Sequence, residues 1–201
     1  MSKSREQLND YLKKININDM FVLDLGVQDK PSSRMCPGKP KEYYTMDIDN
    51  QWSPDIVGDL NEEISTWDLS KTLERHYNWP IGGSDFDVIF CIETLEHCWN
   101  PVQAVKNIYH LLKKGGTSYI STPFINPHHD THDYLRYTNE WYRDVLPKVG
   151  FSEVKIHERV ATIGMPMLKS FYQLEGLRVS KIRPEYGKYT YPIGYFVEAI
   201  K

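Results

Sequence analysis

The strongest chemical signal in this chain is a short apolar segment that ends in acids and an imidazole. Residues 86–92 are almost entirely apolar, and Glu93, Glu96 and His97 follow at once. In open α/β sheets, ligands bind just beyond the carboxyl ends of the strands, where packing alone poorly explains charged residues. The segment therefore predicts a functional site at the end of a buried strand.

A second polar strand end lies further along the chain. Residues 117–121 read as another strand and lead into residues 123–133, which include His128 and His132. Because consecutive parallel strands present their carboxyl ends at one edge of a sheet, the two polar ends are expected to meet. The sequence therefore predicts one site that joins these histidines to His97.

Strands and helices alternate along the rest of the chain. Apolar periodicity and turn residues predict strands at 21–26, 43–49, 55–59, 86–91, 117–121, 151–159 and 195–200. Helices are expected at 4–15 and 62–76, after Pro101, and between Thr138 and Gly150. This alternation predicts one doubly wound α/β domain that covers residues 1–201.

Some helix ends carry additional signals. Ser4 and Gln7 form a capping-box pair for the first helix. Asn100 and Pro101 supply an N-cap and a proline at the first helical position. Residues 113–116, Lys-Lys-Gly-Gly, are expected to end that helix with cations and a left-handed glycine.

Composition limits the class of protein. The 201 residues are 40% hydrophobic and 25% charged with a net charge of -3, which favours a soluble domain and makes nucleic-acid binding unlikely. No apolar run approaches the roughly 18 residues of a membrane helix, and the polar N-terminus has no signal-peptide core. The 3 cysteines form no even framework, so reduced thiols and a cytoplasmic location are expected.

The ordered motifs of the chain lie at residues 22–26, 44–49, 55–60, 86–97, 111–116, 122–124 and 132–138. In this order they resemble the class I S-adenosylmethionine-dependent methyltransferases. The similarity is to the small type-11-like branch, which is often linked to modification of sugars and other small molecules. The resemblance implies a single Rossmann-like methyltransferase domain. The family's sheet is seven-stranded and mostly parallel, with an antiparallel last strand and helices on both faces.

The resemblance also implies where S-adenosylmethionine binds. Asp47 follows Gly26 at about 20 residues, the spacing at which a carboxylate ending the second strand reaches ribose hydroxyls. Asp59 would accept from the adenine amino group with Leu60 against the ring, and Asp24 would hold loop amides. The structural alternatives are that Asp47 or Asp49 merely caps a loop and that Asp59 is a turn carboxylate. The expected cofactor set is completed by Ile48, Ile92 and Glu93.

The first loop departs from the family pattern. Residues 26–33 hold one glycine, where the family has a glycine-rich loop. A backbone cradle without glycine needs φ angles that bulky residues adopt reluctantly. The methionine end of the cofactor is therefore expected to bind differently or weakly, and a cofactor-binding relic without catalysis stays an alternative. A nicotinamide dehydrogenase is disfavoured because it relies on a Gly-x-Gly-x-x-Gly turn.

Methyl transfer to a hydroxyl requires close positioning and a base. The acceptor atom must lie about 3 Å from the methyl group, and its proton must be removed. His97 is the first candidate for this base, followed by His128 and His132, while Glu96 would orient His97 or line the pocket. The alternative is that His97 only packs on the cofactor. The expected acceptor is a hydroxyl of a small polar molecule such as a sugar or a related metabolite.

The spacing Glu93-x-x-Glu96-His97 allows a second mechanism. A similar motif binds a divalent cation in quinone-precursor O-methyltransferases and in small-RNA 3′-end 2′-O-methyltransferases. Such a cation draws in the acceptor hydroxyl and lowers its pKa. A further ligand would come from His128, His129 or His132.

Residues 132–138 argue against that metal, because they also resemble the corresponding segment of metal-free family members. In those members Asp133 and Arg136 would form a structural ion pair. A metal is therefore not favoured, and a metal-assisted methyltransferase acting on an RNA end is the runner-up function.

Two segments are left for other roles. Residues 1–19 contain the N-terminal helix, and residues 160–192 match the family poorly. The second segment is expected to recognise the acceptor or a second subunit, or to pack on the sheet edge. The expected partner is a small-molecule acceptor, without a membrane, for a monomer or a homodimer.

Overall fold

The computed structural model describes residues 2–28, 31–68, 86–163 and 189–201, and in this part of the chain a 7-stranded sheet has the order β3-β2-β1-β4-β5-β7-β6. β7 pairs antiparallel with both β5 and β6, and the other pairs are parallel. The strands are β1 (Phe21–Leu25), β2 (Glu42–Asp47), β3 (Ile56–Val57), β4 (Phe86–Ile92), β5 (Leu112–Pro123), β6 (Glu153–Ile163) and β7 (Tyr189–Ile200). This is the mostly parallel sheet with an antiparallel last strand that the sequence predicts.

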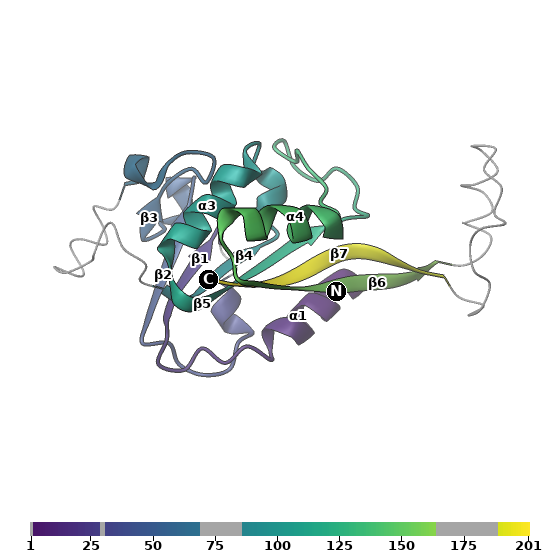
Figure 1. The fold of residues 1–201 in the computed structure, drawn as a ribbon, viewed down its shortest axis with the longest axis horizontal. Coiled ribbons are helices and arrows are strands. Elements are labelled where there is room, and N and C mark those ends of the chain that lie inside the picture. Colours follow the sequence, from purple (N-terminus) through teal and green to yellow (C-terminus); the bar gives the residue numbers. More distant parts are fainter. Residues whose placement is uncertain (1, 29–30, 69–85, 164–188) are drawn as a thin grey trace.

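Helices cover both faces of the sheet, as Figure 1 shows. α3 (Pro101–Leu111) and α4 (Asn139–Val149) lie on one face, and α1 (Lys3–Leu12) lies on the other. The short 3-10 helices are η1 (Ser32–Arg34), η2 (Asn50–Trp52), η3 (Ile64–Thr66) and η4 (Leu95–His97). No helix within the described ranges combines the length and apolarity that a membrane crossing requires.

Two hydrophobic cores flank the sheet, because successive side chains of a strand point to opposite faces. In β1, Val22 packs in the core under α1, whereas Leu23 packs in the core under α3 and α4. β4 repeats the alternation with Phe90 on the first side and Ile89 on the second. The sheet is thus buried on both faces, and its strand ends are left to carry the polar groups.

The capping-box prediction for α1 is wrong. The N-cap is Ser2, whose hydroxyl accepts from the Arg5 N–H at 3.2 Å, two residues before the predicted cap. Ser4 and Gln7 make tertiary contacts instead. Gln7 pairs with the backbone of Val160 in both directions, at 2.7 and 2.8 Å, so it joins α1 to β6.

The helix after Asn100 begins as predicted but ends earlier. The Asn100 side chain accepts from the Gln103 N–H at 3.4 Å, with Pro101 at the start of α3. The chain is already extended at Leu112, where β5 begins. Gly115, with φ +81°, therefore lies inside β5 rather than at the helix end. Sheet pairing with β4 ends the helix before the glycine is reached.

The other boundaries follow the sequence to different degrees. Thr138 is the N-cap of α4 but makes no side-chain capping bond, and Gly150, with φ +129°, ends that helix. Of the helix expected at 62–76, the described part contains only η3, and the rest lies outside the described residues. Most of the segment 160–192 also lies outside them.

Candidate functional site

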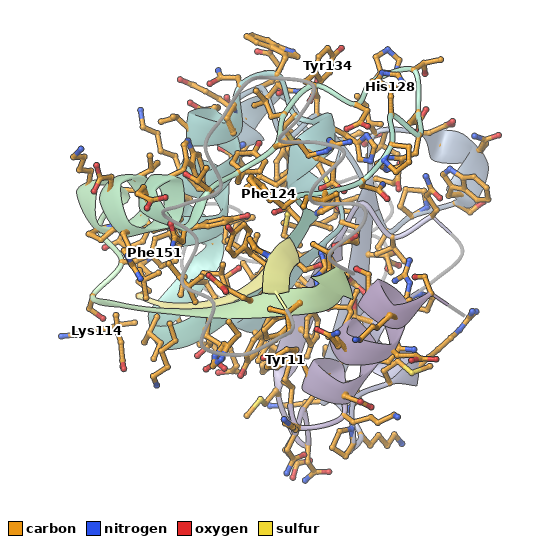
Figure 2. The ribbon with its side chains drawn as sticks, turned by 90° about the vertical axis from the view of Figure 1, so that its right-hand side faces the viewer. Tyr11, Lys114, Phe124, His128, Tyr134 and Phe151 are labelled. Atoms are coloured by element: carbon orange, nitrogen blue, oxygen red, sulfur yellow. The ribbon has the colours of Figure 1, made fainter. Side chains whose placement is uncertain are left out.

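A pocket of about 600 Å³ opens at the carboxyl ends of β1, β2, β3 and β4. Within the described part of the chain, Leu60, Glu96 and His128 do not line it. Leu60 and Glu96 are buried, whereas His128 is exposed on the loop after β5, where Figure 2 labels it. The pocket is lined by nine of the predicted site residues: Asp24, Gly26, Asp47, Ile48, Asp59, Ile92, Glu93, His97 and His132.

The loop after β1 is held by a buried carboxylate. Asp24 accepts from the Ser32 N–H at 2.6 Å, from the Ser32 hydroxyl at 3.1 Å and from the Tyr43 hydroxyl. Burial raises the pKa of Asp24 to about 6, although these hydrogen bonds oppose the shift. Asp24 is placed to anchor the loop, as the resemblance implies.

Gly26 is required where β1 turns into this loop. Its φ is +67°, and a Cβ there would lie 2.4 Å from a methyl carbon of Thr94. Gln28 also has a positive φ, +49°, and its N–H donates to the Asp47 carboxylate at 3.1 Å. The loop therefore makes its left-handed turn partly without glycine, with side-chain bonds supporting the strained backbone.

Two carboxylates mark the side of the pocket at β2 and β3. Asp47 is 6% exposed and also accepts from the Asp49 N–H at 3.0 Å, while Asp49 itself caps η2. Asp59 accepts from the backbone and side-chain nitrogens of Asn61 at 2.8 and 2.7 Å. Asn61 lines the pocket where Leu60 was expected, because Leu60 turns into the core.

Glu93 sits at the end of β4 in a left-handed conformation with φ +52°. Its Oε1 accepts from the Ser121 hydroxyl at 2.8 Å and from Arg159 Nη2 at 2.7 Å. Arg159 comes from β6 and is 1% exposed. Nη2 also donates to the Thr122 carbonyl at 2.5 Å, and Nη1 donates to the Ser4 hydroxyl at 3.1 Å. A buried guanidinium thus fixes one oxygen of a carboxylate that lines the pocket.

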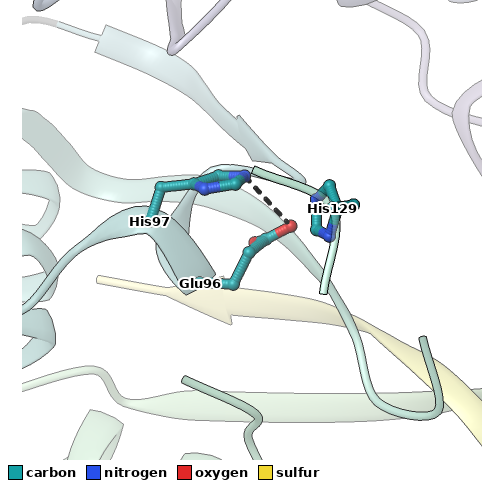
Figure 3. Close-up of side chains that lie close together, drawn as sticks. All are labelled: Glu96, His97 and His129. Carbon is teal, nitrogen blue, oxygen red and sulfur yellow. Dashed lines mark ion pairs between the residues drawn. The ribbon is translucent and has the colours of Figure 1, made fainter. Parts of the chain in front are cut away.

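Glu96, His97 and His129 form a compact cluster beside the pocket, shown in Figure 3. One ligand atom from each lies within 4.8 Å of the others, and His97 Nε2 is 3.9 Å from Glu96 Oε1. His97 Nδ1 is 2.9 Å from the His132 carbonyl oxygen. Because a carbonyl only accepts, Nδ1 must donate, and Nε2 of a neutral His97 therefore keeps a lone pair.

Glu96 is the least satisfied group of the cluster. Its side chain is 0% exposed, and neither carboxyl oxygen has a hydrogen-bond partner within the described residues. Burial raises its pKa to about 8, and the nearby charge of Glu93 adds to the rise. A buried carboxyl group without donors favours a proton or a cation beside it.

Backbone contacts join the loop after β5 to η4. The N–H groups of Tyr134 and Leu135 donate to the Glu96 carbonyl at 2.9 and 3.3 Å. Arg136 Nη2 binds Asp133 Oδ2 at 2.6 Å, which is the ion pair expected from residues 132–138. This pair holds the pKa of Asp133 well below its usual range. The two polar strand ends therefore meet, as predicted.

Several lining residues were not predicted from the sequence. Trp99 and Tyr134, 58% and 50% exposed, carry a weak signal, since each is an aromatic residue beside a predicted motif. Asn61 directly follows the predicted adenine site. Arg5 has no local signal at all, because it reaches the pocket only through the packing of α1.

A family model described as a methyltransferase domain matches residues 2–158. No curated protein matches the chain. Among solved structures, the YcgJ protein of Bacillus subtilis is 10% identical with a TM-score of 0.59, and the alignment covers 98% of both chains.

Two further solved structures share the fold. A SAM-dependent methyltransferase of Archaeoglobus fulgidus is 16% identical with a TM-score of 0.58, over 98% of this chain and 94% of that one. Phosphoethanolamine N-methyltransferase 2 of Haemonchus contortus, in complex with S-adenosyl-L-methionine, is 13% identical with a TM-score of 0.53. That alignment covers 97% of this chain and 52% of the other. At these identities the likeness is one of fold.

Proposed function

This chain belongs to the methyltransferase domain family and has the class I S-adenosylmethionine-dependent methyltransferase fold, and we propose that it methylates a hydroxyl of a small polar molecule. A sugar or a related metabolite is the acceptor class that the sequence resemblance favours. The observation that carries the proposal is the pocket itself. It joins Asp47 and Asp59 at one side to Glu93 and His97 at the other. The narrower type-11-like resemblance stays a prediction.

The residues around the pocket fit S-adenosylmethionine. Gly26 has no side chain, so it lines the pocket with backbone atoms that a ligand can approach closely. Asp47 would accept from the ribose hydroxyls, and Asp59 and Asn61 would meet the adenine edge. The bound cofactor supplies an electrophilic methyl group. The protein supplies position and removes a proton from the acceptor.

We assign the role of proton acceptor to His97. Its Nδ1 donates to the His132 carbonyl, which orients the ring and leaves Nε2 as the basic atom. Glu96 lies 3.9 Å from Nε2, so an ionised Glu96 would stabilise the imidazolium that forms. His132 lines the pocket, whereas His128 does not.

The test compares binding and turnover in wild type and His97→Ala. Wild type is expected to bind S-adenosylmethionine and S-adenosylhomocysteine in calorimetry and to methylate an acceptor found in a screen of hydroxylated metabolites. His97→Ala should lower turnover by about 10²- to 10⁴-fold, the usual contribution of a general base, with little change in cofactor affinity. No cofactor binding by wild type at millimolar concentration would overturn the proposal.

A metal-assisted reaction on an RNA end is the second candidate, favoured by the cluster of Glu96, His97 and His129. One carboxylate and two imidazoles suit a first-row transition metal, and the unpartnered Glu96 fits a cation. This set differs from the predicted Glu93, Glu96 and His97, because Glu93 pairs with Arg159. A cation held there would lower the pKa of the acceptor hydroxyl.

Chelation separates the two candidates. The metal-assisted reaction should stop after dialysis against EDTA and return with manganese or magnesium, whereas the metal-free reaction should persist. Turnover with an RNA 3′ end, and none with small metabolites, would favour the second candidate.

We further propose a cytoplasmic location, since the thiols of Cys36, Cys91 and Cys98 are buried and unbridged. The proposed assembly is a monomer or a homodimer.

A further inference from the structure

The first turn of α1 forms part of the pocket wall. Arg5 lies on this turn, is exposed, and lines the pocket together with Glu93 and Gly26. Within the described part of the chain, Arg5 is the only lysine or arginine that lines it. A guanidinium in such a position is suited to a carboxylate, which it can bind through two parallel hydrogen bonds.

Tertiary contacts hold this turn in place on both sides of Arg5. The Ser4 hydroxyl accepts from Arg159 Nη1 at 3.1 Å. Gln7 exchanges two hydrogen bonds with the Val160 backbone, at 2.7 and 2.8 Å. Because the residues on either side of Arg5 are attached to adjacent positions of β6, the backbone that carries Arg5 is positioned before any ligand binds.

The guanidinium of Arg159 joins the first turn of α1, which carries Arg5, to Glu93. Arg159 bonds Ser4 through Nη1 and Glu93 Oε1 through Nη2. This arrangement depends on Gly194 of β7, since a Cβ there would lie 2.3 Å from Arg159 Nη2. The first turn of α1 and the end of β4 therefore meet at one buried side chain.

Glu93 is oriented so that one of its carboxylate oxygens can accept a hydrogen bond from a ligand. Within the described ranges, the two side chains that donate to its carboxylate, Ser121 and Arg159, both bind Oε1. Since Glu93 lines the pocket, Oε2 is available to accept from a bound molecule. A carboxylate oxygen in this position favours a cationic group of the ligand.

The loop after β1 is poorly suited to bind the amino-acid end of the cofactor. Residues 26–33 contain one glycine, and its turn is made by Gly26 and Gln28 while Asp24 holds Ser32. A loop of this kind offers fewer closely approaching backbone amides to the amino-acid end of a cofactor. That end is a zwitterion, whose carboxylate and ammonium groups require a cation and an anion respectively.

We propose that Arg5 binds the carboxylate and Glu93 the ammonium group of the methionine end of S-adenosylmethionine. Arg159 and Ser121 act as positioning residues for Glu93. The proposal rests on the proposed function, because Asp47 and Asp59 place the adenosine at β2 and β3. The remainder of the cofactor then extends toward the ends of β1 and β4, where Gly26 and Glu93 lie.

The experiment compares two ligands that differ in the amino-acid end. S-adenosylhomocysteine carries the zwitterion, and 5′-methylthioadenosine retains the adenosine and sulfur without it. Calorimetry of Arg5→Met should show S-adenosylhomocysteine bound about 10- to 100-fold more weakly, because a hydrogen-bonded charge pair is lost. The affinity for 5′-methylthioadenosine should stay within about twofold of wild type.

Matched variants make the comparison specific. Lys3→Met removes a cation from the same turn of α1, at a residue that does not line the pocket, and should leave both affinities unchanged. Arg5→Lys should restore part of the lost affinity, since it keeps the charge without the planar fork. Glu93→Gln should repeat the selective loss for S-adenosylhomocysteine. Thermal unfolding of each variant confirms that it is folded.

The outcomes distinguish this proposal from the proposed function. If wild type binds both ligands and Arg5→Met changes neither affinity, or weakens both equally, the zwitterion assignment is overturned and the methyltransferase reading stands. If wild type binds neither ligand, both proposals fail together. Equal wild-type affinity for the two ligands would also overturn the assignment, because the amino-acid end would then contribute nothing.

Discussion

Two buried carboxyl groups lie close to the same pocket in opposite surroundings. Asp24, 2% exposed, accepts two hydrogen bonds from Ser32 and one from Tyr43. Glu96, 0% exposed, accepts none within the described residues. Burial raises both pKa values, to about 6 for Asp24 and to about 8 for Glu96. The donors around Asp24 oppose the rise of its pKa, whereas the charge of Glu93 adds to the rise at Glu96.

The difference separates a structural carboxyl group from one available for chemistry. Asp24 uses its hydrogen bonds to hold the loop after β1, so replacing Asp24 should lower stability more than turnover. The Glu96 carboxyl group accepts no hydrogen bond within the described residues, and a buried polar group left without donors costs free energy. Its position 3.9 Å from His97 Nε2 links it instead to the proton-accepting atom of the site.

The largest expected effect is on turnover. Glu96→Gln, assayed near pH 8.5, should lower turnover by about 10²-fold, because an ion pair about 4 Å apart contributes up to about 4 kcal/mol at an effective dielectric constant of 20. Asp24→Asn should keep nearly normal turnover at saturating cofactor. Steady-state rates of both variants with one acceptor give the comparison. Equal losses would mean that the two carboxyl groups do not differ in role.

A smaller effect is expected on stability, and here Asp24→Asn should be the more damaging of the two substitutions. Asp24→Asn should lower the free energy of unfolding by about 1–3 kcal/mol, because hydrogen bonds to a buried carboxylate are lost and Ser32 or Tyr43 is left unsatisfied. Glu96→Gln should be neutral or stabilising, since it removes a buried ionisable carboxyl group that accepts no hydrogen bond within the described residues. Urea unfolding at pH 7 measures both. A strongly destabilised Glu96→Gln would show that Glu96 has a structural role.

The smallest expected effect concerns pH. A carboxyl group whose pKa is higher in the folded state stabilises the fold below its unfolded pKa and loses that contribution as pH rises through the folded value. For Asp24 the loss falls between about 4 and about 6, and for Glu96 between about 4.5 and about 8. Wild type should therefore lose a few degrees of Tm as pH rises from 6 to 8, at about 2–4 °C per kcal/mol.

Glu96→Gln should abolish most of that loss between pH 6 and 8, whereas Asp24→Asn should leave it in place. Turnover should rise with pH over the same range, since ionised Glu96 stabilises the protonated His97. Differential scanning fluorimetry in EDTA-containing buffers from pH 5 to 9 provides the measurement. A wild-type Tm that rises between pH 6 and 8 would contradict the raised pKa of Glu96.

Much of the fold could be predicted from the sequence because its signals are local. Strand periodicity and the residues at strand ends placed Asp47, Asp59, Glu93 and His97 at one edge of the sheet, and the pocket confirms that placement. The N-cap at Asn100 needed only its own neighbours. The capping box at Ser4 failed because the side chains of Ser4 and Gln7 are used by residues more than 150 positions away.

The remaining features depend on packing between distant segments, which no local pattern records. The sequence by itself determined the order of strands and helices and the chemical groups that end the strands, because periodicity, caps and spacing act over a few residues. Only the tertiary structure decided that Arg5 reaches the pocket and that Arg159 is buried against Glu93. It also decided that the Glu96 carboxyl group meets no donor among the described residues. These contacts form only when the two hydrophobic cores pack against the sheet and exclude water from the groups between the packed segments.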